Sequence, residues 1–161
     1  MLTILYPKED FTAADIAVRL NALVIGSTDN QEVYIVPKHF GRNPEDVLRR
    51  LRKTKSAIFI AFDKEKIDRE TQSDLEEIFR LGIKTYALVP KEMKVSAKLK
   101  ENLRIHEYSK TSPKSLQNAS SDLLKDINTR ETSVVGGLLA VAGILGLGML
   151  FLAAMTDNGK K

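Results

Sequence analysis

Four lysines stand directly after apolar, strand-like runs, and their amines are the first groups in the sequence that could do chemistry. Lys8 ends "LTILYPK", Lys38 ends "EVYIVPK", Lys64 ends "SAIFIAFDK" and Lys91 ends "YALVPK". Ammonium groups favour an anionic ligand such as the phosphates of a nucleotide. His39 follows Lys38 and is a further candidate for the same site. The alternative is that proline ends each strand and that lysine is an ordinary solvated loop residue.

These lysines would share one site if the runs before them form a parallel sheet. The strand-like runs are residues 2–6, 33–37, 57–62 and 84–89, with a weaker run at 103–108. The carboxyl ends of parallel strands all point the same way, and open α/β sheets bind ligands in the crevice beyond those ends. The sequence therefore predicts a ligand site lined by lysines at the carboxyl edge of a five-stranded sheet.

Helix-like stretches alternate with these runs. Asn43 as N-cap, Pro44 at the first helical position and Gly82 at a helix end are local signals for their boundaries. Alternation of strands and helices favours a mostly parallel sheet with helices on both faces, as in flavodoxin-like folds. The expected helices cover residues 10–23, 43–54, 70–82 and 115–130.

Composition and motifs exclude several classes of protein. The chain has no Cys and two His, which is too few for a zinc-like cluster, so no metal site is predicted. Neither G-x-G-x-x-G, nor a Walker-type loop, nor G-x-S-x-G occurs. The net charge of +4 permits anionic partners, but the basic run "RRLRKTK" (49–55) lacks interleaved aromatic residues and argues against nucleic acid. This run suits a helix C-terminus or contact with anionic lipid headgroups.

The C-terminal part contains an apolar stretch that predicts one transmembrane helix. Residues 134–155 carry no charge, and the nearest flanking charges are Glu131 and Asp157. These 22 residues would extend roughly 33 Å as a helix, close to the hydrocarbon thickness of a bilayer. The alternative is a very apolar helix buried at the end of the domain.

One face of this predicted helix is rich in small residues. Gly136, Ala140, Gly143 and Leu147 recur at spacings of four and three, so they line one side. Small residues at such spacing let membrane helices approach closely, which predicts a homo-oligomer. The alternative is a lipid anchor without self-association.

The order of segments predicts a tail-anchored protein with a cytoplasmic domain. No secretory signal precedes the first strand, and residues 156–161 form a short tail after the apolar stretch. We expect an α/β domain at 1–110, an amphipathic helix or linker at 111–133 and a single-pass C-terminal membrane anchor at 134–155.

Residues 1–110 resemble Toll/interleukin-1 receptor (TIR) domains and the related nucleoside deoxyribosyltransferases. The segment "PKHFGRNPEDVLRRLRKTKSAIFIAF" has the TIR order of loop, helix and apolar strand, with Gly41 at the loop position. The segment "DRETQSD" (68–74) aligns with the deoxyribosyltransferase pattern D-x-G-T-x-x-E, and Asp74 falls on the catalytic Glu position. The resemblance implies a flavodoxin-like fold and marks Asp74 as a candidate catalytic carboxylate. The alternative is a solvated Asp stabilised by the helix dipole.

The resemblance and the membrane segment together define the functional hypothesis. The acidic position carries Asp rather than Glu, so we expect a sensor or effector without catalysis. Its ligand would be NAD-like or a cyclic nucleotide, and binding would drive oligomerisation that perturbs the membrane. This arrangement resembles bacterial immune (antiphage) effectors. The alternatives are a membrane-bound NAD-cleaving or deoxyribosyltransferase-like enzyme, and a non-catalytic adaptor tethered to the membrane.

Overall fold

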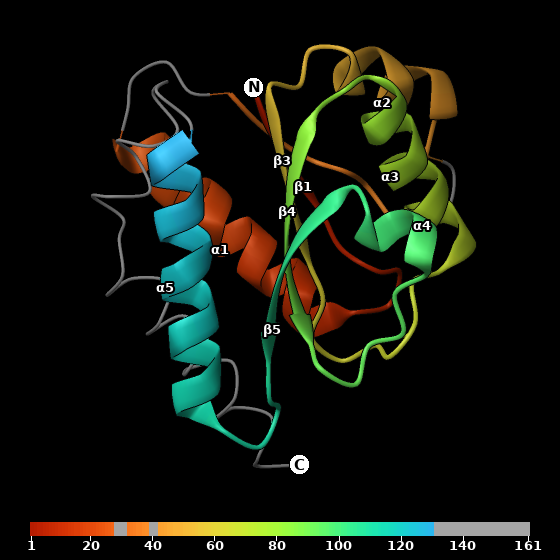
Figure 1. Cartoon of the computed structure of the whole chain (residues 1–161). Helices are drawn as coiled ribbons and strands as arrows, with labels where there is room; N and C mark the ends of the chain where they lie inside the picture. The colour runs from red at the N-terminus through yellow and green to blue at the C-terminus, as the bar shows by residue number, and fades with distance from the viewer. Residues whose placement is uncertain (28–31, 39–41, 131–161) are drawn as a thin grey trace.

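The structure is a computed structural model that describes residues 1–27, 32–38 and 42–130. Strands and helices alternate along these residues, and Figure 1 shows the helices on both sides of a central sheet. In chain order the elements are β1 (Leu2–Leu5), α1 (Phe11–Ser27), β2 (Val33–Ile35), α2 (Pro44–Leu51), β3 (Ser56–Ile60), α3 (Arg69–Arg80), β4 (Lys84–Pro90), α4 (Ala97–Lys100), β5 (Leu103–Tyr108) and α5 (Pro113–Arg130).

The five strands form one sheet in the order β2-β1-β3-β4-β5, and each neighbouring pair is parallel. Leu2 is in register with Val33 on one side and with Ser56 on the other. This strand order is that of flavodoxin-like folds, in which the order reverses between β1 and β3. The predicted α/β class with a five-stranded parallel sheet is therefore confirmed.

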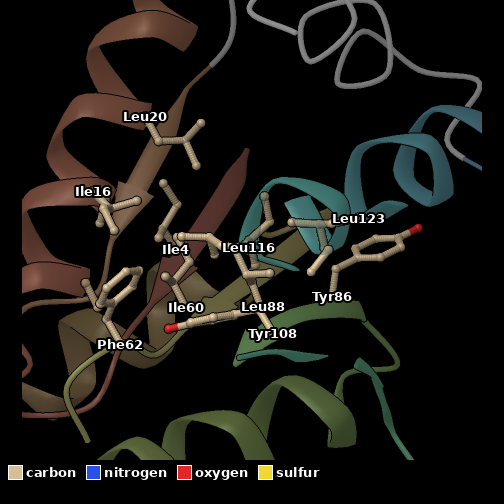
Figure 2. Close-up of a cluster of buried hydrophobic side chains, with 14 of the residues drawn as sticks. Ile4, Ile16, Leu20, Ile60, Phe62, Tyr86, Leu88, Tyr108, Leu116 and Leu123 are labelled. Carbon is tan, nitrogen blue, oxygen red and sulfur yellow. The ribbon is translucent and has the colours of Figure 1, made fainter. Parts of the chain in front are cut away.

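One face of the sheet is covered by α1 and α5. Figure 2 shows the core between them, in which Ile4, Ile60 and Leu88 of the sheet meet Ile16 of α1 and Leu116 of α5. Helices α2, α3 and α4 cover the other face. Successive strand residues point to opposite faces, so Leu5 beside Ile4 enters the second core. Burial on both faces explains why these runs are apolar throughout.

Local signals in the sequence mark where several of these helices begin or end. The Asn43 side chain accepts hydrogen bonds from the N–H groups of Glu45 and Asp46, which confirms it as the N-cap of α2. Gly82 follows α3 with a φ of 70°, a left-handed conformation that glycine adopts without steric cost. The short helix α4 was not predicted; Ser96 caps it by accepting from the N–H of Leu99.

Helix α5 packs on the sheet, a point that the sequence left open. Its residues Leu116, Ala119, Leu123 and Ile127 are buried in the first core. Within residues 1–27, 32–38 and 42–130, no helix has the length and apolar character needed to cross a membrane. The predicted span at 134–155 lies outside the described residues, as do its small-residue positions Gly136, Ala140, Gly143 and Leu147.

Candidate functional site

The four lysines follow the carboxyl ends of β1, β2, β3 and β4, so the parallel sheet places all of them beyond the same edge. Their surroundings differ. Lys8 and Lys91 are exposed and Lys64 is half-buried, whereas the side chain of Lys38 is 4% exposed. His39 lies outside the described residues. The carboxyl edge therefore carries the four lysines among carboxylates such as Glu9 and Asp68, and the lysines do not share one environment.

Lys38 belongs to a buried cluster of charges that links the segment after β2 to α3. Its Nζ lies 2.9 Å from Oδ2 of Asp74. Arg42 donates two hydrogen bonds to the same carboxylate, from Nη1 at 3.0 Å and from Nη2 at 2.9 Å. Glu70 completes the cluster, with Oε1 3.4 Å from Nε of Arg42 and 3.9 Å from Nζ of Lys38.

The carboxylate of Asp74 is at the centre of this cluster and is 5% exposed. The hydrogen bonding between Arg42 and this carboxylate is the main reason that the pKa of Arg42 is raised. Both oxygens of Asp74 thus accept hydrogen bonds from cations. The alternative of a solvated Asp stabilised only by the helix dipole does not describe this buried side chain. To act as a base or nucleophile, Asp74 would first have to lose these partners.

The first turn of α3 is fastened to the loop after β1 by Asp68. This N-cap residue accepts from the N–H of Lys8 at 2.7 Å and from the N–H and hydroxyl of Thr71. The Thr71 hydroxyl also lies 3.2 Å from the carbonyl oxygen of Tyr6. Burial raises the pKa of Asp68, but the hydrogen bonds from Thr71 and Lys8 outweigh it, so the net pKa is lowered. The sequence analysis did not single out Asp68 as an N-cap, although Asp is a preferred residue at that position.

Asp10 closes the crevice between β1 and β3, where the strand order reverses. Its carboxylate accepts from the N–H groups of Phe62 at 2.7 Å, Asp63 at 3.1 Å and Ala13 at 3.0 Å. Asp10 is 1% exposed, and burial raises its pKa despite these hydrogen bonds. The usual ligand crevice of such sheets is therefore filled by the protein itself at this position.

An open hollow remains beside this point, between the ends of β1 and β2 and the start of α1. Its volume is about 320 Å3, within the range of small-molecule sites. Its apolar lining comes from the side chains of Tyr6, Phe11, Ala14 and Pro37, and its polar lining from Lys8, Glu9, Asp10 and Lys38.

Two features of this hollow are unusual for a soluble surface. Phe11 is 77% exposed, although a large aromatic side chain is stabilised by burial. Glu9 has a φ of 62°, a left-handed conformation that costs energy for a residue with a side chain. Strained backbone and exposed aromatic surface concentrate where proteins bind ligands.

The other lysines lie elsewhere along the carboxyl edge. Lys64 forms a surface ion pair with Glu9, with 3.4 Å between Nζ and Oε2. Lys91 lines a separate hollow of about 390 Å3 together with His106 and Asp122. The structure thus brings Lys8 and Lys38 to one hollow and Lys8 and Lys64 to a neighbouring one, and it places Lys91 at a third.

A larger hollow of about 720 Å3 lies on the side of the sheet covered by α2, α3 and α4. It contacts Arg42 and Asp74 from behind the charge cluster. Four of the charged residues that line it form two ion pairs, Arg80 with Glu77 and Lys98 with Glu76. Size alone therefore does not make it the better ligand site.

No family model, curated protein or solved structure matches this chain. The resemblance to TIR domains and deoxyribosyltransferases consequently stays a prediction, and so does the role of Asp74 that it implies. The parallel five-stranded sheet with flavodoxin-like strand order stands on the structure itself.

Proposed function

We propose that this protein binds a small, anionic, aromatic ligand of nucleotide type in the hollow beside β1 and β2, as a membrane-anchored sensor. The observation that carries the proposal is that the exposed Phe11 and the exposed Lys8 line the same hollow. An aromatic face stacks a base, and an exposed cation attracts phosphate. Residues 134–155, by their sequence alone, supply the anchor and the small-residue face for oligomerisation.

Lys8 is the cation best placed to meet a phosphate. Its side chain has no ion-pair partner in the described residues, whereas Lys38 in the same hollow is held by Asp74. The backbone N–H of Lys8 donates to Asp68, which holds the loop that carries it. We therefore assign phosphate attraction to Lys8 and base stacking to Phe11 and Tyr6.

The charge cluster supports binding without catalysis. Three hydrogen bonds from cations hold Asp74, so its carboxylate is not available to attack a glycosidic carbon. We expect the full chain to leave NAD intact. Turnover of NAD that disappears in Asp74→Asn would instead establish the enzymatic alternative.

A titration of the full chain in lipid nanodiscs tests the proposal. NAD and cyclic nucleotides serve as probes, and calorimetry or fluorescence reports binding. Phe11→Ala should weaken binding by about 1–3 kcal/mol, the usual contribution of one stacking side chain. Val18→Ala is the matched control, because Val18 is the other exposed large apolar residue of α1 among those described and lies outside the hollow.

Lys8→Gln should also weaken binding, and Lys94→Gln should not, since Lys94 is exposed and does not line the hollow. No binding of either probe class by the intact chain at millimolar concentration would refute the sensing function. Replacing residues 134–155 by poly-Leu tests oligomerisation separately. If ligand-driven assembly survives that exchange, the small-residue face is unnecessary. The adaptor alternative predicts no small-molecule ligand and no loss when another anchor replaces the native one.

A further inference from the structure

Helix α5 delivers the chain to the amino edge of the sheet, opposite the ligand hollow. Near its start, the Ser115 hydroxyl accepts from the N–H of Ser109, just after β5 ends. Near its end, a carboxylate oxygen of Asp126 lies 3.7 Å from Nη1 of Arg104, the second residue of β5, and the other lies 3.6 Å from Nε2 of His106. Figure 1 shows α5 antiparallel to the strand that precedes it.

The length of chain after α5 limits where a membrane anchor can begin. Helix α5 ends at Arg130, and the apolar stretch begins at Val134. The four Cα–Cα steps from residue 130 to residue 134 reach about 14 Å even when fully extended. An anchor at 134–155 therefore has to enter the bilayer close to the amino edge, which brings that edge to the headgroups.

The amino edge carries a group of exposed cations that the proposed ligand site does not use. Lys55 precedes β3, and its N–H donates to the carbonyl oxygen of Met1 at 3.0 Å. Lys84 begins β4 in register with Ser56, so it lies one strand away. We call the exposed residues Arg52, Lys53, Lys55 and Lys84 the amino-edge cations.

Most of these charges are available to a partner. Arg49 and Arg50, in the same basic run, pair with Asp46, and Arg50 also stacks over the ring of Tyr34. Arg52, Lys53 and Lys55 form no ion pair within the described part of the chain.

Acidic side chains at the same edge do not cancel this charge. Glu32 and Glu101 are the exposed carboxylates next to the first residues of β2 and β5. Glu77, toward the end of α3, is paired with Arg80 and also interacts electrostatically with Arg52 without a close ion pair. Lys100 adds a further exposed cation beside Glu101.

We propose that the amino edge of the sheet is a lipid-binding surface whose cations contact anionic headgroups. This inference rests on the anchoring part of the proposed function. Each cation near such a surface strengthens association by about fivefold, so Arg52, Lys53 and Lys55 together supply on the order of a hundredfold. The ligand hollow, at the opposite ends of the strands, then faces away from the bilayer.

Site-directed fluorescence on the full chain in nanodiscs tests this orientation. The chain has no Cys, so Asn102→Cys at the amino edge and Glu92→Cys at the carboxyl edge each give one labelling site. Lipids with a quencher on the headgroup should quench the label at 102 more than the label at 92. Discs of phosphatidylcholine and phosphatidylglycerol should increase this difference over phosphatidylcholine alone, and high salt should reduce it.

A neutralised variant tests the cations themselves. Arg52→Gln, Lys53→Gln and Lys55→Gln together should abolish the dependence on phosphatidylglycerol. The matched control changes Lys66, Lys94 and Lys114 to Gln, which removes the same charge from exposed positions at the carboxyl edge and should leave the dependence intact. Equal quenching of the two labels, or an unchanged dependence in the neutralised variant, would overturn the proposal.

Carbonate extraction separates this failure from failure of the anchor. If carbonate releases the chain from membranes, residues 134–155 do not anchor it, and the proposed function loses that part. Salt-sensitive cosedimentation of the full chain with phosphatidylglycerol vesicles then still tests the surface. Loss of cosedimentation in the neutralised variant supports lipid binding, and persistence of cosedimentation refutes it.

Discussion

Two regions of the carboxyl edge are each closed by a buried aspartate, but with different partners. Between β1 and β3, Asp10 accepts from three backbone N–H groups. Between the segment after β2 and α3, Asp74 accepts from the side chains of Arg42 and Lys38. Asp10 is held by backbone N–H groups, whereas Asp74 is held by long cationic side chains.

This difference indicates which closure can be altered by a ligand. Backbone N–H groups at the start of α1 and after β3 cannot leave Asp10 without distorting the sheet. Lys38 lines both the charge cluster and the hollow, so an anionic ligand could compete with Asp74 for its ammonium group. The region after β2 is therefore the part of the site best suited to respond to binding.

Removal of the Asp10 carboxylate should have the largest effect on stability. Asp10→Ala leaves buried N–H groups without acceptors and removes the helix cap, so we expect a loss of about 4 kcal/mol in the free energy of unfolding. Urea denaturation measures this loss. Asp15→Ala, on the exposed side of the same helix, is the control and should change little. A loss of less than about 1 kcal/mol for Asp10→Ala would contradict the sealing role.

Disruption of the charge cluster should come next. Arg42→Met leaves Asp74 buried with Lys38 as its remaining close cation, and breaking a buried pair in this way costs about 3 kcal/mol. In the double variant Arg42→Met/Asp74→Leu the cost should be less than the sum of the two single costs, because the orphaned charge is gone. Arg69→Met, at an exposed position, is the control. Additive costs would show that the cluster is not coupled.

The pH dependence of stability distinguishes Asp10 from Asp68, the N-cap residue of α3. The pKa of Asp10 is raised on folding, so its contribution is greatest at low pH and is lost as pH rises through that raised pKa. Asp10→Asn should remove a slope of up to about 1.4 kcal/mol per pH unit. The pKa of Asp68 is lowered, so its contribution is lost as pH falls, and Asp68→Asn should change the slope with the opposite sign. Unfolding measured from neutral pH to below pH 3.8 checks both signs, because the Asp10 contribution changes above this ordinary Asp value and the Asp68 contribution changes below it.

The smallest effect is expected at Gly82, which ends the helix that carries Asp74 without touching the cluster. An added Cβ at Gly82 would meet no atom within 4 Å, so the cost of Gly82→Ala comes from the left-handed backbone alone. We expect about 1 kcal/mol, and less for Gly82→Asn. Equal losses for both variants would argue against a conformational origin. The midpoint of urea unfolding reports the difference.

Much of the fold could be predicted from the sequence because its signals are local. Runs such as 56–60 are apolar on both faces, and the Asn43-Pro44 pair marks the start of α2 without tertiary information. The short helix α4 escaped prediction because four residues are too few to show a periodic pattern.

The candidate site was only partly predictable. The placement of Lys8 and Lys38 beyond the strand ends follows from parallel strands, but the burial of Lys38 does not. Its partner Asp74 is 36 residues away in sequence. Phe11 as an exposed aromatic residue was also missed, since the helix pattern alone does not indicate which aromatic side chain stays outside the core.

The sequence by itself determined the strand and helix order, the cationic strand ends and the apolar stretch at 134–155, because periodicity and composition act over neighbouring residues. Only the tertiary structure decided that Lys38 and Arg42 form ion pairs with Asp74, that Asp10 fills the crevice and that Lys8 lines a hollow. Those outcomes depend on the balance between desolvation of a charge and the partners that other elements bring within hydrogen-bond distance, and that balance exists only once the sheet has formed.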